Sequence, residues 1–221
     1  MRVVKAASFL NERYDTFNAI LQKFLYATEP VIETLPTVAV LAVAGPVSNN
    51  KVLFTSNGWL IDGKDIEADF GGAKGIKRAV LINDFVGCGY GVLTLDHKTE
   101  AVCLNEAKMV EGAPIVCVGA GTGLGECYLT SHKGDKGTYE CFASEGGHAE
   151  FAPRTDVEFE LLKFLKKKFS AKHRVSTERV VSGTGLANLY EFFSHKNPSK
   201  ANKKVAKEFE KAGSMKVRQG R

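Results

Sequence analysis

Four glycines between residues 119 and 125 constrain the fold of this chain more than any other feature of its sequence. They alternate with other residues in Gly119-Ala120-Gly121-Thr122-Gly123-Leu124-Gly125, which joins the apolar segments 113–118 and 126–130. Two strand-like segments around such a loop predict a hairpin that turns at the glycines. Because glycine lacks a Cβ and admits positive φ, successive N–H groups can point into one concavity and bind an anion there.

This loop matches neither of two common phosphate-binding patterns. A P-loop needs Gly-Lys-Ser/Thr, and the dinucleotide pattern Gly-x-Gly-x-x-Gly is broken because residue 124 is Leu and residue 126 is Glu. The Thr122 hydroxyl adds a further hydrogen-bond donor. On the evidence of the loop alone, an ordinary tight turn remains an alternative.

A polar pair follows a predicted strand further upstream. Residues 79–82, Ala-Val-Leu-Ile, predict a buried strand that runs directly into Asn83 and Asp84. Ligands of open α/β sheets bind at the carboxyl ends of strands, so this amide and carboxylate are candidate binding groups. The alternative role for Asp84 is the N-cap of the following helix, and the two roles are compatible.

A second polar pair lies in the segment Ser144-Glu145-Gly146-Gly147-His148. Two consecutive glycines predict a tight bend that brings Glu145 and His148 together. A carboxylate and an imidazole on one turn can hold neighbouring hydroxyl groups. The alternatives are a surface charge for Glu145 and a turn residue packed on Phe151 for His148.

The composition is that of a globular protein with a substantial core. The chain has 221 residues, of which 44% are hydrophobic, and no apolar run long enough to span a membrane. Its first residues lack the apolar core of a signal peptide, so we expect a cytoplasmic protein with no membrane partner. Five widely spaced cysteines without a Cys-x-x-Cys pair predict reduced thiols and no structural metal.

Charge is distributed unevenly along the chain. Residues 161–221 contain 16 Lys and Arg against 4 Asp and Glu, whereas residues 1–160 contain 14 against 21. Such asymmetry can mark a nucleic-acid or membrane partner, but no aromatic-basic pattern of a nucleic-acid-binding module accompanies it. Leu161, Leu165 and Phe169 share one stripe of a predicted helix, with the lysines elsewhere. A solvated basic face is therefore the simpler interpretation, and we expect no nucleic-acid partner.

Alternating strands and helices predict an α/β fold. Helices are expected at 17–26, 65–70, after Asp84, at 156–169, 184–193 and 202–210. A buried strand is expected at 38–44, and further strands at 51–55, 79–82 and in the hairpin 113–130. Trp59 is expected in the core rather than at a ligand. We expect two domains, residues 1–96 and residues 97–221.

Together the motifs resemble those of the bacterial-type glucokinases, ATP-dependent sugar kinases of the hexokinase and actin-like superfamily. The resemblance covers nearly the whole chain and includes six motifs in the family's order: Ala44-Gly45-Pro46-Val47, Asn57-Gly58-Trp59, Ile82-Asn83-Asp84-Phe85, the hairpin 119–125, Glu145-Gly146-Gly147-His148 and the segment 176–186. It implies a two-lobed sugar kinase with the ribonuclease H-like (actin-like ATPase) fold. The two expected domains would then be parts of its small and large lobes.

The resemblance also implies roles for individual residues. Asp84 would be the catalytic base, and the glucose-binding residues would be Asn83, Asp84, Glu145, His148 and Glu178. The hairpin would be the family's second phosphate-binding loop, with the ATP-binding residues Gly119, Gly121, Thr122 and Gly123. ATP and Mg²⁺ are the implied cofactors, and no residue of this chain is assigned as a metal ligand. A homodimer stays open.

One family motif, the Asp-x-Gly-Gly-Thr-Asn of the first phosphate loop, does not occur in this sequence. We therefore expect the chain to be the middle of a glucokinase and expect residues 1–221 by themselves to lack glucokinase activity. Two functions stay open. One is a glucokinase that phosphorylates glucose to glucose 6-phosphate at the entry to glycolysis. The other is a non-catalytic sugar-binding relative or inactive fragment.

Overall fold

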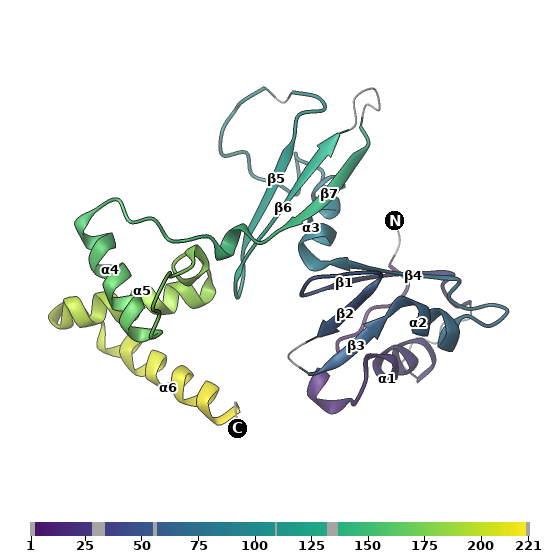
Figure 1. Ribbon diagram of the computed structural model, residues 1–221, viewed down its shortest axis with the longest axis horizontal. Helices are drawn as coiled ribbons and strands as arrows, with labels where there is room; N and C mark the ends of the chain where they lie inside the picture. The colour runs from purple at the N-terminus through teal and green to yellow at the C-terminus, as the bar shows by residue number, and fades with distance from the viewer. Residues whose placement is uncertain (1–2, 28–33, 55–56, 109, 132–136, 220–221) are drawn as a thin grey trace. The chain divides into compact units, whose positions relative to one another are not determined.

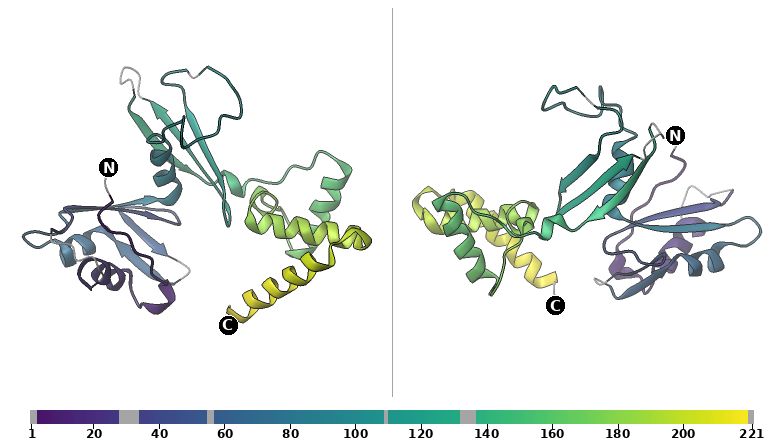
Figure 2. Two further views of the ribbon diagram at one scale, coloured as in Figure 1. Left: turned by 180° about the vertical axis from the view of Figure 1, so that it is seen from behind. Right: turned by 45° about the horizontal axis from the view of Figure 1, so that its top comes forward.

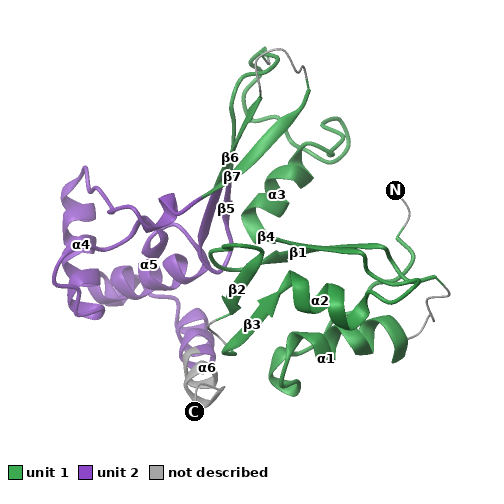
Figure 3. Cartoon of the chain, turned by 45° about the vertical axis from the view of Figure 1, so that its right-hand side comes forward, with its two compact units in different colours: residues 1–117, 127–143 green, residues 118–126, 144–221 purple. Residues whose placement is uncertain are grey.

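The computed structural model describes residues 3–27, 34–54, 57–108, 110–131 and 137–219 (Figure 1). The chain divides into two compact units, residues 1–117 with 127–143 and residues 118–126 with 144–221 (Figure 3). The lobe boundary expected at residue 97 stays a prediction. Within the described ranges, none of the helices combines the length and the apolar composition that a membrane span requires.

The first unit begins with helices and then alternates strands and helices. In chain order its first elements are η1 (Asn11–Arg13), α1 (Phe17–Gln22), the π-helical η2 (Lys23–Ala27), β1 (Val38–Val43), β2 (Lys51–Phe54), β3 (Trp59–Asp62), α2 (Gly63–Phe70), β4 (Arg78–Asn83) and α3 (Asp84–Val92). These elements confirm the predicted helix at 17–26 and the three predicted strands, although Thr55 lies outside the described residues. Helix α2 begins two residues earlier than expected, because the Asp62 carboxylate caps it by accepting the Lys64 N–H at 2.9 Å.

Strands β1 and β4 pair in parallel, with Val43 opposite Asn83. The carboxyl ends of both strands therefore lie at one edge, and α3 begins there at Asp84. The prediction that residues 38–44 form a buried strand is wrong, whereas in β4 the predicted strand 79–82 contains no exposed residue. Val38 and Val40 are 54% and 62% exposed, whereas Leu81 is buried. One face of the pair packs on the core, and an unbroken apolar run does not distinguish a strand covered on one face from a strand covered on both.

The core of the first unit lies between this strand pair, the β2–β3 hairpin and α2. Strands β2 and β3 are antiparallel, with Phe54 opposite Trp59. The Trp59 side chain is buried among the core residues, as predicted. Ile66 of α2 and Ile76, just before β4, are also fully buried. This packing supports the sheet edge at which Asn83 and Asp84 lie.

Strands β5 (Ile115–Ala120), β6 (Leu124–Ser131) and β7 (Tyr139–Ser144) form one three-stranded sheet in that order (Figures 1 and 2). The glycine turn joins β5 to β6, which confirms the predicted hairpin. Phe85 and Val86 of α3 pack against a buried cluster of three β6 and β7 residues: Cys127, Leu129 and Cys141. All five cysteines are free thiols.

The second unit is mainly helical after the sheet. Its elements are η3 (Gly146–His148), α4 (Asp156–Lys168), η4 (Thr177–Arg179), α5 (Gly183–Lys196), η5 (Pro198–Lys200) and α6 (Lys203–Gln219). A capping box formed by Thr155 and Glu158 begins α4, and Leu161 and Leu165 of α4 are buried with Phe192 of α5. The predicted helices are confirmed, and α5 runs three residues beyond its expected end.

Candidate functional site

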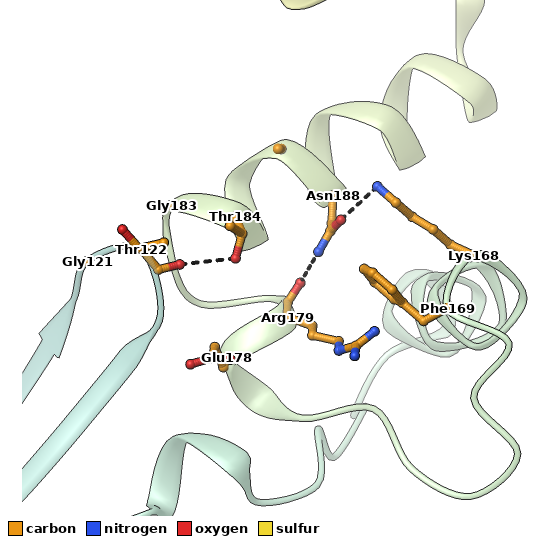
Figure 4. Close-up of a pocket in the computed structure, with 10 residues that line it drawn as sticks. Gly121, Thr122, Lys168, Phe169, Glu178, Arg179, Gly183, Thr184 and Asn188 are labelled. Atoms are coloured by element: carbon orange, nitrogen blue, oxygen red, sulfur yellow. Dashed lines mark hydrogen bonds between the residues drawn. The ribbon is translucent and has the colours of Figure 1, made fainter. Parts of the chain in front are cut away.

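The glycine turn between β5 and β6 is attached to the start of α5. The Gly183 N–H donates to the Gly121 carbonyl oxygen at 2.7 Å, and the Thr184 hydroxyl donates to the Thr122 carbonyl oxygen at 3.1 Å (Figure 4). Ser182 caps α5 by accepting the Gly185 N–H at 2.9 Å. The hairpin therefore lies against a helix N-terminus, where the first N–H groups carry partial positive charge.

Glu145, His148 and Glu178 form a polar cluster beside this hairpin. The predicted bend is the short 3-10 helix η3, which places His148 Nε2 3.5 Å from Glu145 Oε2. On the other side of the imidazole, His148 Nδ1 lies 3.9 Å from Glu178 Oε1. Glycine at 147 allows this turn to approach β6, because a Cβ there would lie 2.1 Å from the Leu124 carbonyl oxygen.

An open pocket of about 710 Å³ lies between the glycine turn, the end of α4 and the start of α5 (Figure 4). It is lined by Gly121, Thr122, Lys168, Phe169, Glu178, Arg179, Gly183, Thr184, Ala187 and Asn188. Backbone groups of the turn, two cationic side chains and one aromatic ring thus face a single cavity. Such a mixture of apolar walls and a few placed polar groups is typical of small-molecule sites.

The cationic side chains of the pocket are held in different ways. Lys168 Nζ donates to Asn188 Oδ1 at 2.8 Å and pairs with the Glu191 carboxylate at 2.5 Å. The Arg179 guanidinium stacks on Phe169, with its central carbon 3.7 Å from the ring centroid. One nitrogen of Arg179, Nη1, is buried and has no hydrogen-bond partner among the described residues.

Asn83 and Asp84 belong to the first unit. Asn83 is the N-cap of α3: its Oδ1 accepts the Phe85 N–H at 2.9 Å, and its Nδ2 donates to the Gly45 carbonyl oxygen at 3.3 Å. The alternative role of Asp84 as the N-cap is therefore wrong, because Asn83 occupies that position. Asp84 is the first helical residue, and its Oδ1 also accepts the Phe85 N–H at 2.9 Å. The second Asp84 oxygen is not used in this contact.

The comparisons with known proteins agree with the motifs. A family model described as glucokinase matches residues 2–219. The chain belongs to the glucokinase family. A glucokinase from Synechocystis sp. is 41% identical over 169 residues, covering 76% of this chain and 45% of that protein. A glucokinase from Nostoc sp. is 39% identical over 187 residues, covering 85% of this chain and 52% of that protein. The chain thus spans about half the length of the curated glucokinases it matches.

Solved glucokinase structures share the fold. A glucokinase from an Antarctic psychrotroph has a TM-score of 0.66 and 30% identity, covering 88% of this chain and 56% of that chain. A Balamuthia mandrillaris glucokinase, solved in complex with glucose, has a TM-score of 0.64 and 19% identity, covering 83% of this chain and 53% of that chain. These likenesses confirm the α/β sugar-kinase fold expected from the sequence.

Several residues of the pocket were not singled out from the sequence. Lys168 was assigned to a solvated basic face, but its Nζ contacts Asn188 and Glu191 of α5. Arg179 directly follows Glu178 in the family-like segment 176–186 and could have been noticed there. Asn188 carries no local signal, since it is an ordinary helical position whose 5% exposure follows from tertiary packing.

Proposed function

We propose that this chain carries the sugar-binding and phosphate-binding parts of an ATP:hexose 6-phosphotransferase that converts glucose to glucose 6-phosphate. The observation that carries the proposal is the cluster of Glu145, His148 and Glu178 beside the glycine hairpin in a member of the glucokinase family. In our proposal the enzyme acts in the cytoplasm, at the entry to glycolysis. A homodimer is compatible with the proposal but is not needed for it.

The polar cluster is suited to hold a sugar ring. Two carboxylates accept hydrogen bonds from hydroxyl groups, and the imidazole between them can donate or accept. In our proposal Glu145, His148 and Glu178 bind the hydroxyls of glucose. The side-chain amide of Asn83 also binds a hydroxyl, through the Nδ2–H that does not donate to Gly45. If an epimer were bound, the side chains that bind the misplaced hydroxyl would remain unpaired. The free-energy cost of those unpaired groups gives the site its specificity.

Asp84 is the proposed general base. A sugar hydroxyl is a poor nucleophile near neutral pH, so the carboxylate must accept its proton as the oxygen attacks the γ-phosphorus. The Phe85 N–H fixes one Asp84 oxygen at 2.9 Å, and the strand end fixes the backbone. The other oxygen is then presented in one orientation, which favours positioning of the reacting hydroxyl.

The hairpin and its pocket are the proposed nucleotide site. Gly119, Gly121, Thr122 and Gly123 would face the phosphates of ATP. Lys168 and Arg179 add positive charge to the same cavity. Among the described residues, no group of three His, Cys, Asp or Glu side chains is arranged to hold a metal ion. No residue is therefore assigned to Mg²⁺.

The proposal is tested by measuring glucose binding and glucose phosphorylation with protein expressed from its native gene. Calorimetry should detect glucose binding, and a coupled assay with glucose 6-phosphate dehydrogenase should detect turnover. Asp84→Asn should lower kcat by roughly 10²- to 10⁴-fold, the range for loss of a general base, with little change in glucose affinity. Asp156→Asn is the matched control, because Asp156 is likewise the first residue of a helix.

The outcomes separate the two functions considered. Turnover that falls in Asp84→Asn but not in Asp156→Asn supports the kinase. Glucose binding without any turnover in the wild type would instead identify a non-catalytic sugar-binding relative. Absence of glucose binding would overturn both.

A further inference from the structure

The Glu178 carboxylate contacts both the sugar cluster and the glycine hairpin. Its Oε1 lies 3.9 Å from His148 Nδ1, and its Oε2 accepts the Leu124 N–H at 3.0 Å. Leu124 is the first residue of β6, directly after the glycine turn. With 28% of its side chain exposed, Glu178 is less accessible than Glu145 or His148, which are 73% and 54% exposed. One partly buried carboxylate therefore joins two sites that bind different substrates in our proposed function.

The backbone around Glu178 is attached to the same hairpin. The Ser182 hydroxyl donates to the Glu178 carbonyl oxygen at 2.7 Å and caps α5. From the next residue along the chain, the Gly183 N–H donates to Gly121. The segment from Glu178 to Gly183 thus contacts the hairpin at the turn through its backbone and at the start of β6 through the Glu178 side chain. A displacement of the Glu178 carboxylate and a displacement of the hairpin are consequently linked.

Gly123 is the residue that permits this contact. A Cβ built on Gly123 would lie 2.4 Å from Glu178 Oε2 and 3.2 Å from the carboxylate carbon. Atoms this close overlap, so any side chain at 123 would displace the carboxylate or the turn. In contrast, a Cβ on Gly121, in the same turn, would meet no atom within 4 Å. The two glycines therefore differ in whether a methyl group reaches Glu178.

We propose that Glu178 is a positioning residue that couples sugar binding to the phosphate-binding hairpin. When Glu178 is fixed by a sugar hydroxyl and His148, its Oε2 holds the Leu124 N–H and thereby the shape of the turn. When the turn is distorted, the carboxylate is pulled from the sugar. Such coupling is reciprocal by thermodynamic necessity. This inference rests on the proposed function, because it takes the polar cluster as the sugar site.

The test is a double-mutant cycle in glucose affinity, measured by calorimetry without nucleotide on protein expressed from its native gene. Gly123→Ala, although it lies in the hairpin, should weaken glucose binding by on the order of 10-fold, as expected when a hydrogen bond to a charged group is lost. Gly91→Ala, at a glycine of α3 where an added Cβ also meets no described side chain within 4 Å, should leave glucose affinity unchanged. In a Glu178→Ala background, Gly123→Ala should have no further effect, because the carboxylate it displaces is gone.

Each outcome is decisive. Equal glucose affinity of Gly123→Ala and the wild type would overturn the coupling and leave the proposed function intact. The coupling is also overturned if Gly123→Ala weakens binding equally with and without Glu178, since the effect would then reach the sugar by another route. If the wild type binds no glucose, the proposed function falls and the coupling falls with it. Circular dichroism and thermal melting of each variant separate loss of affinity from loss of folding. In the Glu178→Ala background, the methyl group added by Gly123→Ala has no carboxylate to overlap with.

Discussion

The packing of α3 on the three-stranded sheet gives a prediction with an internal control. Gly89 of α3 is buried, and a Cβ added to it would lie 2.6 Å from the Cys141 sulfur and 2.8 Å from the Cys127 sulfur. A Cβ added to Gly91, two residues later in the same helix, would meet no described side chain, and no described backbone atom outside this helix, within 4 Å. The two positions therefore differ in the space available to one methyl group.

The expected magnitudes follow from two terms. Replacing glycine by alanine inside a helix gains up to about 1 kcal/mol of stability from propensity. Gly91→Ala should show that gain, reduced because the position is near the helix end. Gly89→Ala should also incur the cost of overpacking, about 1–3 kcal/mol, because two buried sulfur atoms or the helix must move. Since the propensity gain at residue 91 is no larger than the gain at residue 89, the difference in stability between the two variants gives a lower limit to the overpacking cost.

Urea unfolding of the wild type and the two variants, followed by circular dichroism, measures this difference. The same Gly89→Ala change in a Cys127→Ala, Cys141→Ala background should lose most of its cost, because the sulfur atoms that the methyl group contacts are absent. Equal stability of Gly89→Ala and Gly91→Ala would refute the argument. A cost that persists after both sulfur atoms are removed would show that the destabilisation arises elsewhere in the helix.

Four further predictions concern the Cys127 thiol, a helix cap and the core. Burial raises the pKa of the Cys127 thiol to about 11, so iodoacetamide at pH 8 should modify exposed Cys103 well before Cys127, as mass mapping would show. Because the folded protein keeps this proton while the unfolded chain releases it, stability should fall as the pH rises from 9.0 toward about 11, and less so in Cys127→Ala. Thr155→Ala should cost about 1 kcal/mol in urea unfolding by removing the cap of α4. Leu165→Ala, at a fully buried position, should cost about 2–5 kcal/mol in the same assay.

Local patterns in the sequence predicted most elements of this fold because each pattern depends on neighbouring residues. The strand at 79–82, the helix after it and the glycine hairpin all follow from short-range periodicity and turn chemistry. The prediction that β1 is buried was wrong, because the burial of a strand depends on which elements cover each of its faces. Val38 and Val40 belong to a continuous apolar run, yet they are 54% and 62% exposed. A run of apolar residues predicts a strand, but it does not predict whether other elements cover one face of that strand or both.

In the candidate site, too, contacts between residues close in the chain were predictable, whereas contacts between distant residues were not. The bend that joins Glu145 to His148 was predictable because the two residues lie only three positions apart in the chain. The contact between Glu178 and Leu124 joins residues 54 positions apart, and no local pattern specifies which backbone N–H a distant carboxylate accepts. The glycine at position 123 is nevertheless a sequence feature related to that contact. The sequence predicts that a glycine in this turn lets an anion approach the backbone, and the structure shows that Gly123 also makes room for the carboxylate of Glu178. A glycine-rich turn can therefore be required by an internal partner as much as by a ligand.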